Sequence, residues 1–311
     1  MPIAVHTPAS HPTTPLTDHE SRTFGRFAAF VLAWTALVAL EGGLVRATGS
    51  GAGCGNNWPL CNGQVVFGTP ALATIIEFAH RSLTGIDSAL IVALVVWAFR
   101  LPRGHGARLA STLSAVFLVT EALIGAALVK FGLVVNDASV ARGVVLSIHL
   151  TNTLTLLACL TLALLWSFNG PPVRVPPKGW ISLAAVLLLE MTGSLAALAD
   201  TLYPVHSLSA GLAQDFQSGA NFSVRLRAIH PFLAVAVGLW LIWYAKSRFR
   251  DTLNLSTIVM AAVVAQLFAG IFNLLLLVPV WTQMIHLLLA YAVWIALVAL
   301  CWQPMRGPKP A

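Results

Sequence analysis

The chain has 311 residues, of which 58% are apolar and only 9% are charged, and its mean hydropathy is +0.82. A typical soluble domain carries about 25% charged residues, so this composition excludes a soluble globular protein. A formal net charge of +7 can indicate an acidic partner such as nucleic acid. The placement of the cations along the chain, described below, indicates membrane topology instead.

Eight apolar runs approach the length of about 20 residues that a helix needs to cross the hydrocarbon core. Backbone groups in lipid must be hydrogen-bonded within their own segment, so these runs predict helices. We therefore predict an all-α, polytopic membrane protein with eight transmembrane helices. The predicted spans are 26–45, 72–99, 108–132, 143–168, 180–200, 224–246, 254–278 and 280–303.

Three polar segments lie outside these runs. Residues 1–25 contain Pro, Thr and three His and lack the plan of a cleaved signal, so we predict a disordered cytoplasmic tail that stays attached. The Pro-rich stretch 170–179 is predicted to be a cytoplasmic linker, and 304–311 a second cytoplasmic tail.

Lys and Arg residues indicate the orientation, because cytoplasmic loops are enriched in them. With the N-terminus inside, twelve of the 18 cations fall in inner segments and six in outer segments. Both termini are therefore predicted to be cytoplasmic. The positive charge is explained by topology and by contact with membrane lipid, and we expect no nucleic-acid partner.

The sequence repeats in two halves, 26–169 and 180–303. An acidic residue precedes the first histidine of each half by 39 or 40 residues, and a second histidine follows on the fourth helix. Both halves begin on the inner side, so we predict two pseudo-symmetric four-helix bundles related by an axis along the membrane normal. The residues in register are Glu41 with His80, and Glu190 with His230.

The four histidines of the repeat lie about 6 to 8 residues, or roughly 9–12 Å, from the outer ends of their helices. Ionisable groups in a membrane are costly and usually functional, and two facing imidazoles in a bundle can hold one haem. Packing histidines and a zinc site are the alternatives, but zinc usually takes three or four ligands. The histidines are His80, His149, His230 and His286.

Glu77 stands three residues before His80, so both lie on one helix face. Its carboxylate could exchange protons at a haem edge, or orient the histidine, or pair with an arginine. Arg227 occupies the matching position of the second half. Outer arginines suit haem propionates because guanidinium binds carboxylates in bidentate geometry, and headgroup anchoring is the alternative. These residues are Arg46, Arg81, Arg142, Arg225 and Arg227.

Cys159 and Cys301 lie in apolar runs and are predicted to be core residues. Cys54 and Cys61 share the Gly-rich outer loop. An oxidising outer compartment makes a disulfide between them the expectation, with a thiolate metal site as the lesser alternative and redox activity of the disulfide open.

From about residue 26 to 303 the chain resembles the haem A synthase family. The specific motifs are the run 42–51 (GGLVRATGSG), the cysteine loop with Trp58-Pro59-Leu60 between its cysteines, and Glu77-Phe78-Ala79-His80-Arg81. The shorter matches are Ile148-His149-Leu150, Ile229-His230-Pro231 and the run 285–290.

The resemblance implies an enzyme of the bacterial plasma membrane that oxidises the C8 methyl of haem O to the formyl group of haem A by successive hydroxylations. It implies that His80 and His149, with Arg81, hold the substrate haem, and that Glu77 is the catalytic acid and base. It assigns His230 and His286 to a haem b cofactor, and Cys54 and Cys61 to a disulfide. Implied partners are a haem O-supplying farnesyltransferase and terminal oxidase assembly, with a homo-oligomer open. Some members carry a second cysteine pair in the second half, and residues 200–222 here contain no cysteine.

Two other functions compete. A non-catalytic di-haem cytochrome exchanging electrons with quinone predicts chemically equivalent halves and two haems b. A transporter predicts helices broken in mid-membrane. The contrast between Glu77 and Arg227 favours the enzyme.

Overall fold

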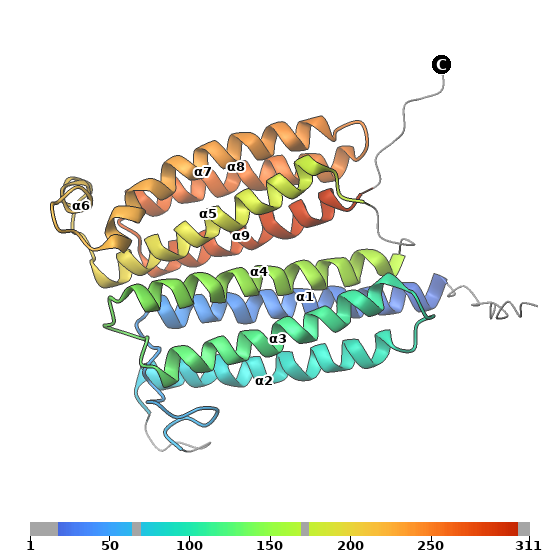
Figure 1. The fold of residues 1–311 in the computed structure, drawn as a ribbon, viewed down its shortest axis with the longest axis horizontal. Coiled ribbons are helices and arrows are strands. Elements are labelled where there is room, and N and C mark those ends of the chain that lie inside the picture. The colour runs from blue at the N-terminus through green and yellow to red at the C-terminus, as the bar shows by residue number, and fades with distance from the viewer. Residues whose placement is uncertain (1–17, 64–69, 169–173, 304–311) are drawn as a thin grey trace, which may run out of the picture.

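The computed structural model describes residues 18–63, 70–168 and 174–303, which form nine α-helices and no β-strand. Eight of these helices are long and apolar enough to span a membrane, which confirms the predicted all-α polytopic class. The helices are α1 (Asp18–Ala47), α2 (Leu72–Ala98), α3 (Gly106–Lys130), α4 (Val140–Phe168), α5 (Pro177–Leu202), α6 (Leu208–Asp215), α7 (Phe222–Ser247), α8 (Leu253–Leu275) and α9 (Val280–Cys301) (Figure 1).

Six helices begin one to eight residues earlier than predicted, and α1 and α5 show why. α1 begins at Asp18, so residues 18–25 are helical and not part of a tail. α5 begins at Pro177, a residue suited to the first turn because it has no N–H to leave unbonded. The rest of the predicted tails and linker, residues 1–17, 170–173 and 304–311, lies outside the described residues.

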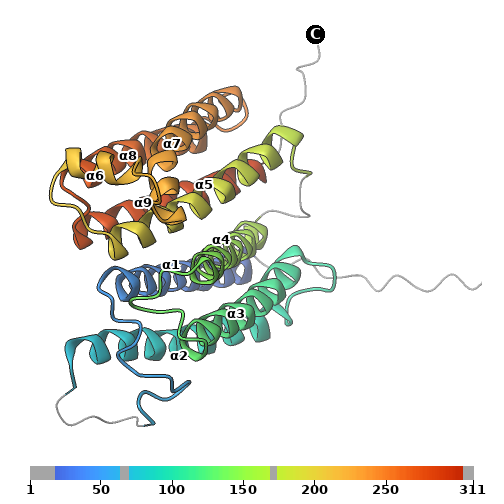
Figure 2. The same cartoon turned by 60° about the vertical axis from the view of Figure 1, so that its left-hand side comes forward.

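The helices form two bundles side by side, α1–α4 in one and α5, α7, α8 and α9 in the other (Figures 1 and 2). The bundles meet where α1 and α4 pack against α5 and α9. Trp294 of α9 donates from Nε1 to the carbonyl oxygen of Leu154 of α4 at 2.6 Å in this buried seam.

Apolar side chains divide between the seam and the outside. Leu154, Leu157 and Leu297 are fully buried, whereas Phe232 and Phe268 are among many large apolar side chains that remain exposed. An apolar outer surface of this extent is stable in lipid and not in water. The spanning helices run without a break, although Pro231 of α7 removes one backbone N–H just after His230.

One end of the molecule carries the elements that shape the site, and we call it the disulfide end. It contains the loop 48–63, the α3–α4 and α8–α9 connections, and the short helix α6 between α5 and α7. The connection between α8 and α9 is a tight turn, with Leu277 and Val278 at φ 62° and 57°. A β-branched residue is strained in this left-handed region, and here the surrounding contacts hold it.

Candidate functional site

Four histidines lie at similar depth near the disulfide end. His80 comes eight residues after the first residue of α2, His149 nine after that of α4, His230 eight after that of α7, and His286 six after that of α9. At 1.5 Å per residue these offsets are roughly 9–14 Å along the helices. The structure therefore brings the predicted ligands into one layer, two in each half.

Each histidine ring packs against a glycine of the helix before it. A side chain at three of these four glycines would crowd the ring, since real Cβ atoms seldom approach a neighbour within 3.4 Å. The missing Cβ thus makes room for the imidazole. The pairs, with the distance from an added Cβ to ring Cε1, are Gly42–His80 (2.9 Å), Gly193–His230 (3.0 Å), Gly270–His286 (3.1 Å) and Gly125–His149 (3.9 Å).

In the first half, carboxylates face the histidine Nδ1 atoms. Glu41 Oε2 is 2.7 Å from His80 Nδ1, and Glu121 Oε1 is 3.2 Å from His149 Nδ1. These are ion-pair distances without hydrogen-bond alignment, and neither Nδ1 has another partner in the described structure. Asn152 also donates to Glu121, at 2.5 Å, so this carboxylate makes the interhelical hydrogen bonds expected of a buried acid.

In the second half, neutral groups contact the histidine rings, one at Nδ1 and one at Nε2. The hydroxyl of Thr192 lies 3.0 Å from His230 Nδ1, and the amide nitrogen of Gln266 lies 3.3 Å from His286 Nε2. The sequence paired Glu41 with Glu190 as equivalent residues of the two halves. This pairing is wrong for the contacts, because Thr192 and not Glu190 contacts His230. Thr192, which directly precedes the ring-contacting glycine as Glu41 does, is the structural counterpart of Glu41.

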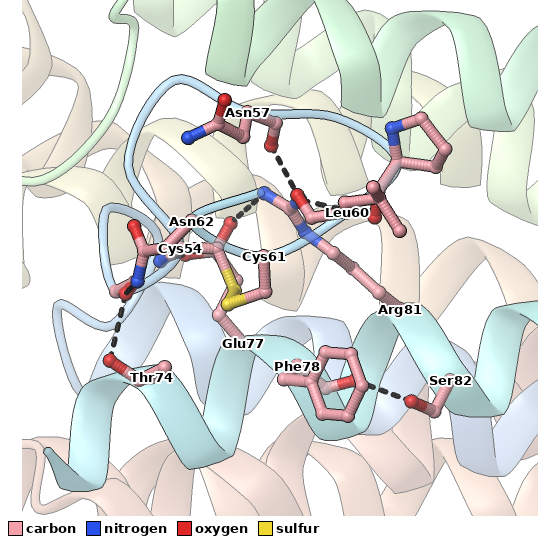
Figure 3. Close-up of a disulfide and its surroundings, with 12 residues drawn as sticks. Cys54, Asn57, Leu60, Cys61, Asn62, Thr74, Glu77, Phe78, Arg81 and Ser82 are labelled. Carbon is pink, nitrogen blue, oxygen red and sulfur yellow. Dashed lines mark hydrogen bonds and ion pairs between the residues drawn. A yellow bond between two sulfur atoms is a disulfide. The ribbon is translucent and has the colours of Figure 1, made fainter. Parts of the chain in front are cut away.

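Glu77 is buried, with 3% of its surface exposed, and it attaches the disulfide loop to α2 (Figure 3). Its Oε2 accepts from the backbone N–H of Cys54 at 2.7 Å, and its Oε1 pairs with Arg81. Thr74 adds a hydrogen bond to the Gly53 carbonyl at 2.8 Å. Of the three roles weighed for Glu77, the structure shows the pairing with an arginine, Arg81.

Arg81 donates hydrogen bonds to the same loop. Besides Glu77, its guanidinium binds the carbonyl oxygens of Asn57 at 2.6 Å and Leu60 at 2.9 Å. The loop is closed by the Cys54–Cys61 disulfide, whose two residues are fully buried. The expected disulfide is thus formed, and the remaining cysteines, Cys159 and Cys301, are free and buried as predicted.

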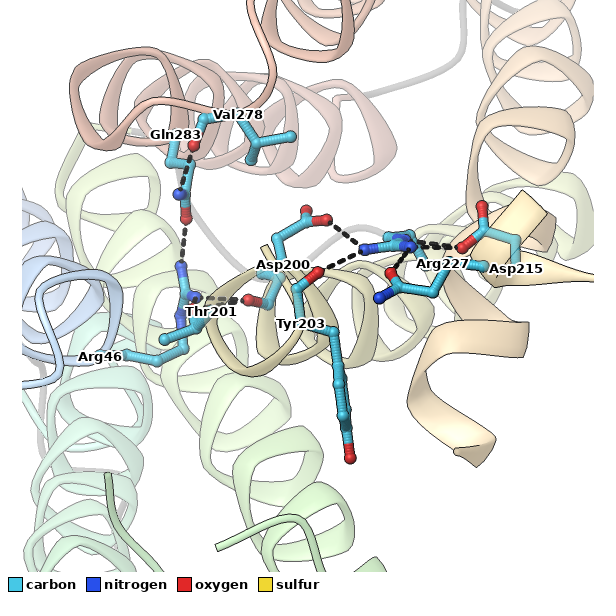
Figure 4. Close-up of polar contacts among 10 residues, drawn as sticks. Arg46, Asp200, Thr201, Tyr203, Asp215, Arg227, Val278 and Gln283 are labelled. Atoms are coloured by element: carbon cyan, nitrogen blue, oxygen red, sulfur yellow. Dashed lines mark hydrogen bonds and ion pairs between the residues drawn. The ribbon is translucent and has the colours of Figure 1, made fainter. Parts of the chain in front are cut away.

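Arg46 of α1 reaches into the second half (Figure 4). It donates to the Ala197 carbonyl at 2.7 Å, to the Thr201 hydroxyl at 2.8 Å and to the Gln283 amide oxygen at 2.9 Å. Gln283 in turn donates to the carbonyl of Val278, one of the two strained turn residues, at 2.9 Å. Arg46 therefore joins the two bundles at the disulfide end.

Arg227 of α7 holds α5 and α6. It binds Asp215 from Nε at 2.9 Å, Gln214 at 2.7 Å and Asp200 at 3.3 Å. Sequence reasoning missed these partners, because α6 is too short and polar to stand out as a hydrophobic pattern. The position that carries Glu77 in the first half thus has a structural cation in the second.

Arg142 and Arg225, the other two predicted propionate partners, differ in their hydrogen bonds and exposure. Arg142 donates to the carbonyls of Val135 and Asp137 at 2.7 and 2.9 Å, and its Nε has no hydrogen-bond partner in the described structure. Arg225 is exposed on the first turn of α7. Of the two, only Arg225 is exposed, because Arg142 is buried.

The residues present fit a planar ligand held by two imidazoles in each half. Glu41 and Thr192 each engage the Nδ1 of their histidine, which leaves Nε2 as the ligating atom. His80 and His149 keep 28% and 25% of their side-chain surface accessible, so part of each ring is uncovered by protein. His230 and His286 lie at similar depth on α7 and α9. Gln266 occupies Nε2 of His286 and would have to release it on ligation.

Comparison with known proteins gives the family. The chain matches COX15-CtaA, described as cytochrome oxidase assembly protein, over residues 25–298. It is 27% identical over 273 residues to a haem A synthase of Halalkalibacterium halodurans, covering 81% of this chain and 87% of that protein. Over 173 residues it is 32% identical to the haem A synthase of Alkalihalophilus pseudofirmus, covering 55% and 56% of the two chains.

A protein of Thermus thermophilus named protoheme IX farnesyltransferase is 44% identical over 296 residues, which cover 91% of this chain. The matched region is 49% of that protein, so the chain spans about half the length of this relative. The match to the family covers nearly all of the described helices and both histidine pairs. The chain belongs to the COX15-CtaA family, the family of the haem A synthases.

Proposed function

We propose that the chain is a membrane-embedded oxidoreductase that converts the C8 methyl of haem O to the formyl group of haem A. The observation that carries the proposal is a chemical difference between two histidine pairs of similar backbone geometry. Both pairs have ring-contacting glycines and lie at similar depth, yet only the first has a buried carboxylate, Glu77, three residues before one of its histidines. One half is suited to reaction and the other to holding a permanent cofactor.

In this proposal His80 and His149 hold the substrate, and His230 and His286 hold haem b, which supplies one-electron transfer when bound. Glu77 exchanges protons at the substrate edge. Each of its oxygens already accepts one donor, and a carboxylate oxygen can accept two, so the group can receive a proton or a water. The disulfide loop and Arg81 hold it in place and keep bulk water away.

A mutant pair separates the two roles of Glu77. Glu77→Gln keeps the shape and the Cys54 contact but removes the exchangeable charge, and haem A formation should fall by about 10²-fold or more while haem content stays near normal. Thr74→Val weakens the same loop attachment without touching the carboxylate and should cost only a few-fold. Haem A is quantified by extraction and chromatography from membranes that make haem O. Equal losses in both variants would reduce Glu77 to a loop anchor.

Haem content tests the function itself. Purified protein from such membranes should contain haem b together with haem O, haem A or a hydroxylated intermediate. Haem b alone, near two per chain, would instead show an electron-transfer cytochrome. The membrane is proposed to be the bacterial plasma membrane, with both termini on the cytoplasmic side.

A farnesyltransferase that supplies haem O is the proposed partner. The Thermus relative supports this pairing, because the part of it outside the match is as long again as the matched half, and its name is that of the farnesyltransferase. Terminal oxidase assembly is proposed as the consumer of the product, in line with the family description. Co-purification of a tagged farnesyltransferase with this chain tests the pairing, and its absence after mild cross-linking would contradict a stable complex.

A further inference from the structure

The two histidine pairs have unlike partners at equivalent positions. Glu41 and Thr192 each precede the glycine that contacts a histidine ring, and Glu121 and Gln266 each lie four residues before theirs. At both positions the first half has a carboxylate and the second half has a neutral group. The same backbone geometry therefore presents charge to one pair of imidazoles and none to the other.

The carboxylates of the first half are placed to act on the rings. Glu41 Oε2 and His80 Nδ1 are 2.7 Å apart and neither has a hydrogen-bond partner in the described structure, so each is the nearest polar group of the other. Asn152 donates to Oε2 of Glu121, and Thr153 donates to Oε1, the oxygen that also faces His149.

An anionic partner at Nδ1–H orients an imidazole and makes its Nε2 a stronger electron donor. A stronger donor stabilises the more oxidised state of a ligated iron, and hydrogen bonding around the ligand is one of the means by which a protein sets a haem potential. In the second half the hydroxyl of Thr192 lies at Nδ1 of His230, whereas the amide of Gln266 lies at Nε2 of His286. Neither group carries a net charge, so neither strengthens the Nε2 donor as an anion at Nδ1–H does.

We propose that Glu41 and Glu121 are positioning residues that give the first half the lower reduction potential of the two haem sites. The inference rests on the proposed function in one respect, that each half holds a haem. It assigns the more oxidising environment, the one suited to accepting electrons, to His230 and His286. The carboxylates act through the histidines and touch neither substrate nor cofactor iron.

The test is a spectroelectrochemical titration of the purified protein loaded with both haems. Glu41→Gln and Glu121→Gln should each raise the potential of the first-half haem and leave the other unchanged. The expected change is about tenfold in the reduction equilibrium, which is about 59 mV for a one-electron couple. His149→Ala and His286→Ala assign the two signals to the halves.

The reciprocal variant Thr192→Glu brings a carboxylate to the Nδ1 side of His230 and should lower the potential of the second-half haem by a similar amount. It keeps the proposal testable if the Glu41 or Glu121 variants lose haem. Glu190→Gln is the matched control, since it removes a carboxylate of α5 that has no ion pair or hydrogen bond with a histidine in the described structure, and both potentials should stay the same.

Unchanged potentials in all three test variants, with both haems bound, would overturn the inference and leave the proposed function intact. A higher potential in the first half of the unmodified protein would overturn it equally. A protein with no haem in the first half even when haem O is supplied would instead defeat the proposed function, so the two failures are distinguishable.

Discussion

The carboxylate of Glu77 accepts a hydrogen bond from the backbone N–H of Cys54 at 2.7 Å. The residue proposed to move protons is thereby also an attachment point of the disulfide loop. Any change that lifts this loop from α2 must alter the surroundings of the carboxylate, even when the change lies in a residue without chemistry of its own.

Gly53→Ala should have this effect. A Cβ at Gly53 would lie 2.4 Å from the backbone of Ala73 and 2.6 Å from the Thr74 nitrogen, and backbone cannot move aside as a flexible side chain can. We expect the loop to separate from α2, with a loss of haem A formation comparable to that of Glu77→Gln. Gly85→Ala is the control, because an added Cβ there meets open space and activity should be retained.

The glycines beneath the histidines should differ in their tolerance of alanine. Gly42→Ala places a Cβ 2.9 Å from His80 and should displace the ring and reduce haem binding in the first half. Gly125→Ala places it 3.9 Å from His149, an ordinary contact, and should retain haem. Haem content by absorbance, per mole of purified protein, decides between these outcomes. Equal haem loss in both variants would contradict the packing argument.

Arg46→Met should weaken the junction of the two bundles. The variant removes three hydrogen bonds from a charged donor, and such bonds contribute about 1.5–3 kcal/mol each at most. We expect a loss of about 2–3 kcal/mol and a thermal midpoint several degrees lower in detergent. The exposed Arg225 is the control, and Arg225→Ala should leave the midpoint unchanged. A midpoint unaffected by Arg46→Met would show that the apolar seam alone joins the bundles.

The orientation deduced from the cations can be tested with inserted reporters. An alkaline phosphatase domain placed at residue 62 in the disulfide loop should be active, because that loop is predicted to lie outside the cytoplasm. The same domain placed at residue 104, between α2 and α3, should be inactive. The opposite pattern would reverse the assignment made from the Lys and Arg distribution.

The spans could be predicted from the sequence because lipid imposes a length and an apolar composition on each helix. The same physics explains what was missed. Residues 18–25 are polar and continue α1 beyond the apolar run, and α6 is only eight residues long. Neither leaves a hydrophobic pattern to read.

The candidate site could be predicted only in part. Spacing was enough to single out four histidines and Glu77, because repeats keep their register. Spacing did not identify the side chains that contact the histidines. Thr192 and Gln266 are ordinary residues in the sequence, and their contacts with His230 and His286 exist only once α5 and α8 pack against α7 and α9. The arginines show the same limit, since the loop carbonyls that hold Arg81 have no sequence signature.

The shared glycines and the unlike partners of the histidines separate two tasks within one fold. The small residues that admit the imidazoles are common to both halves, so the backbone sets where each ring lies. The groups that face the ring nitrogens differ, so a substitution there can change the chemistry of one half without moving the rings of the other.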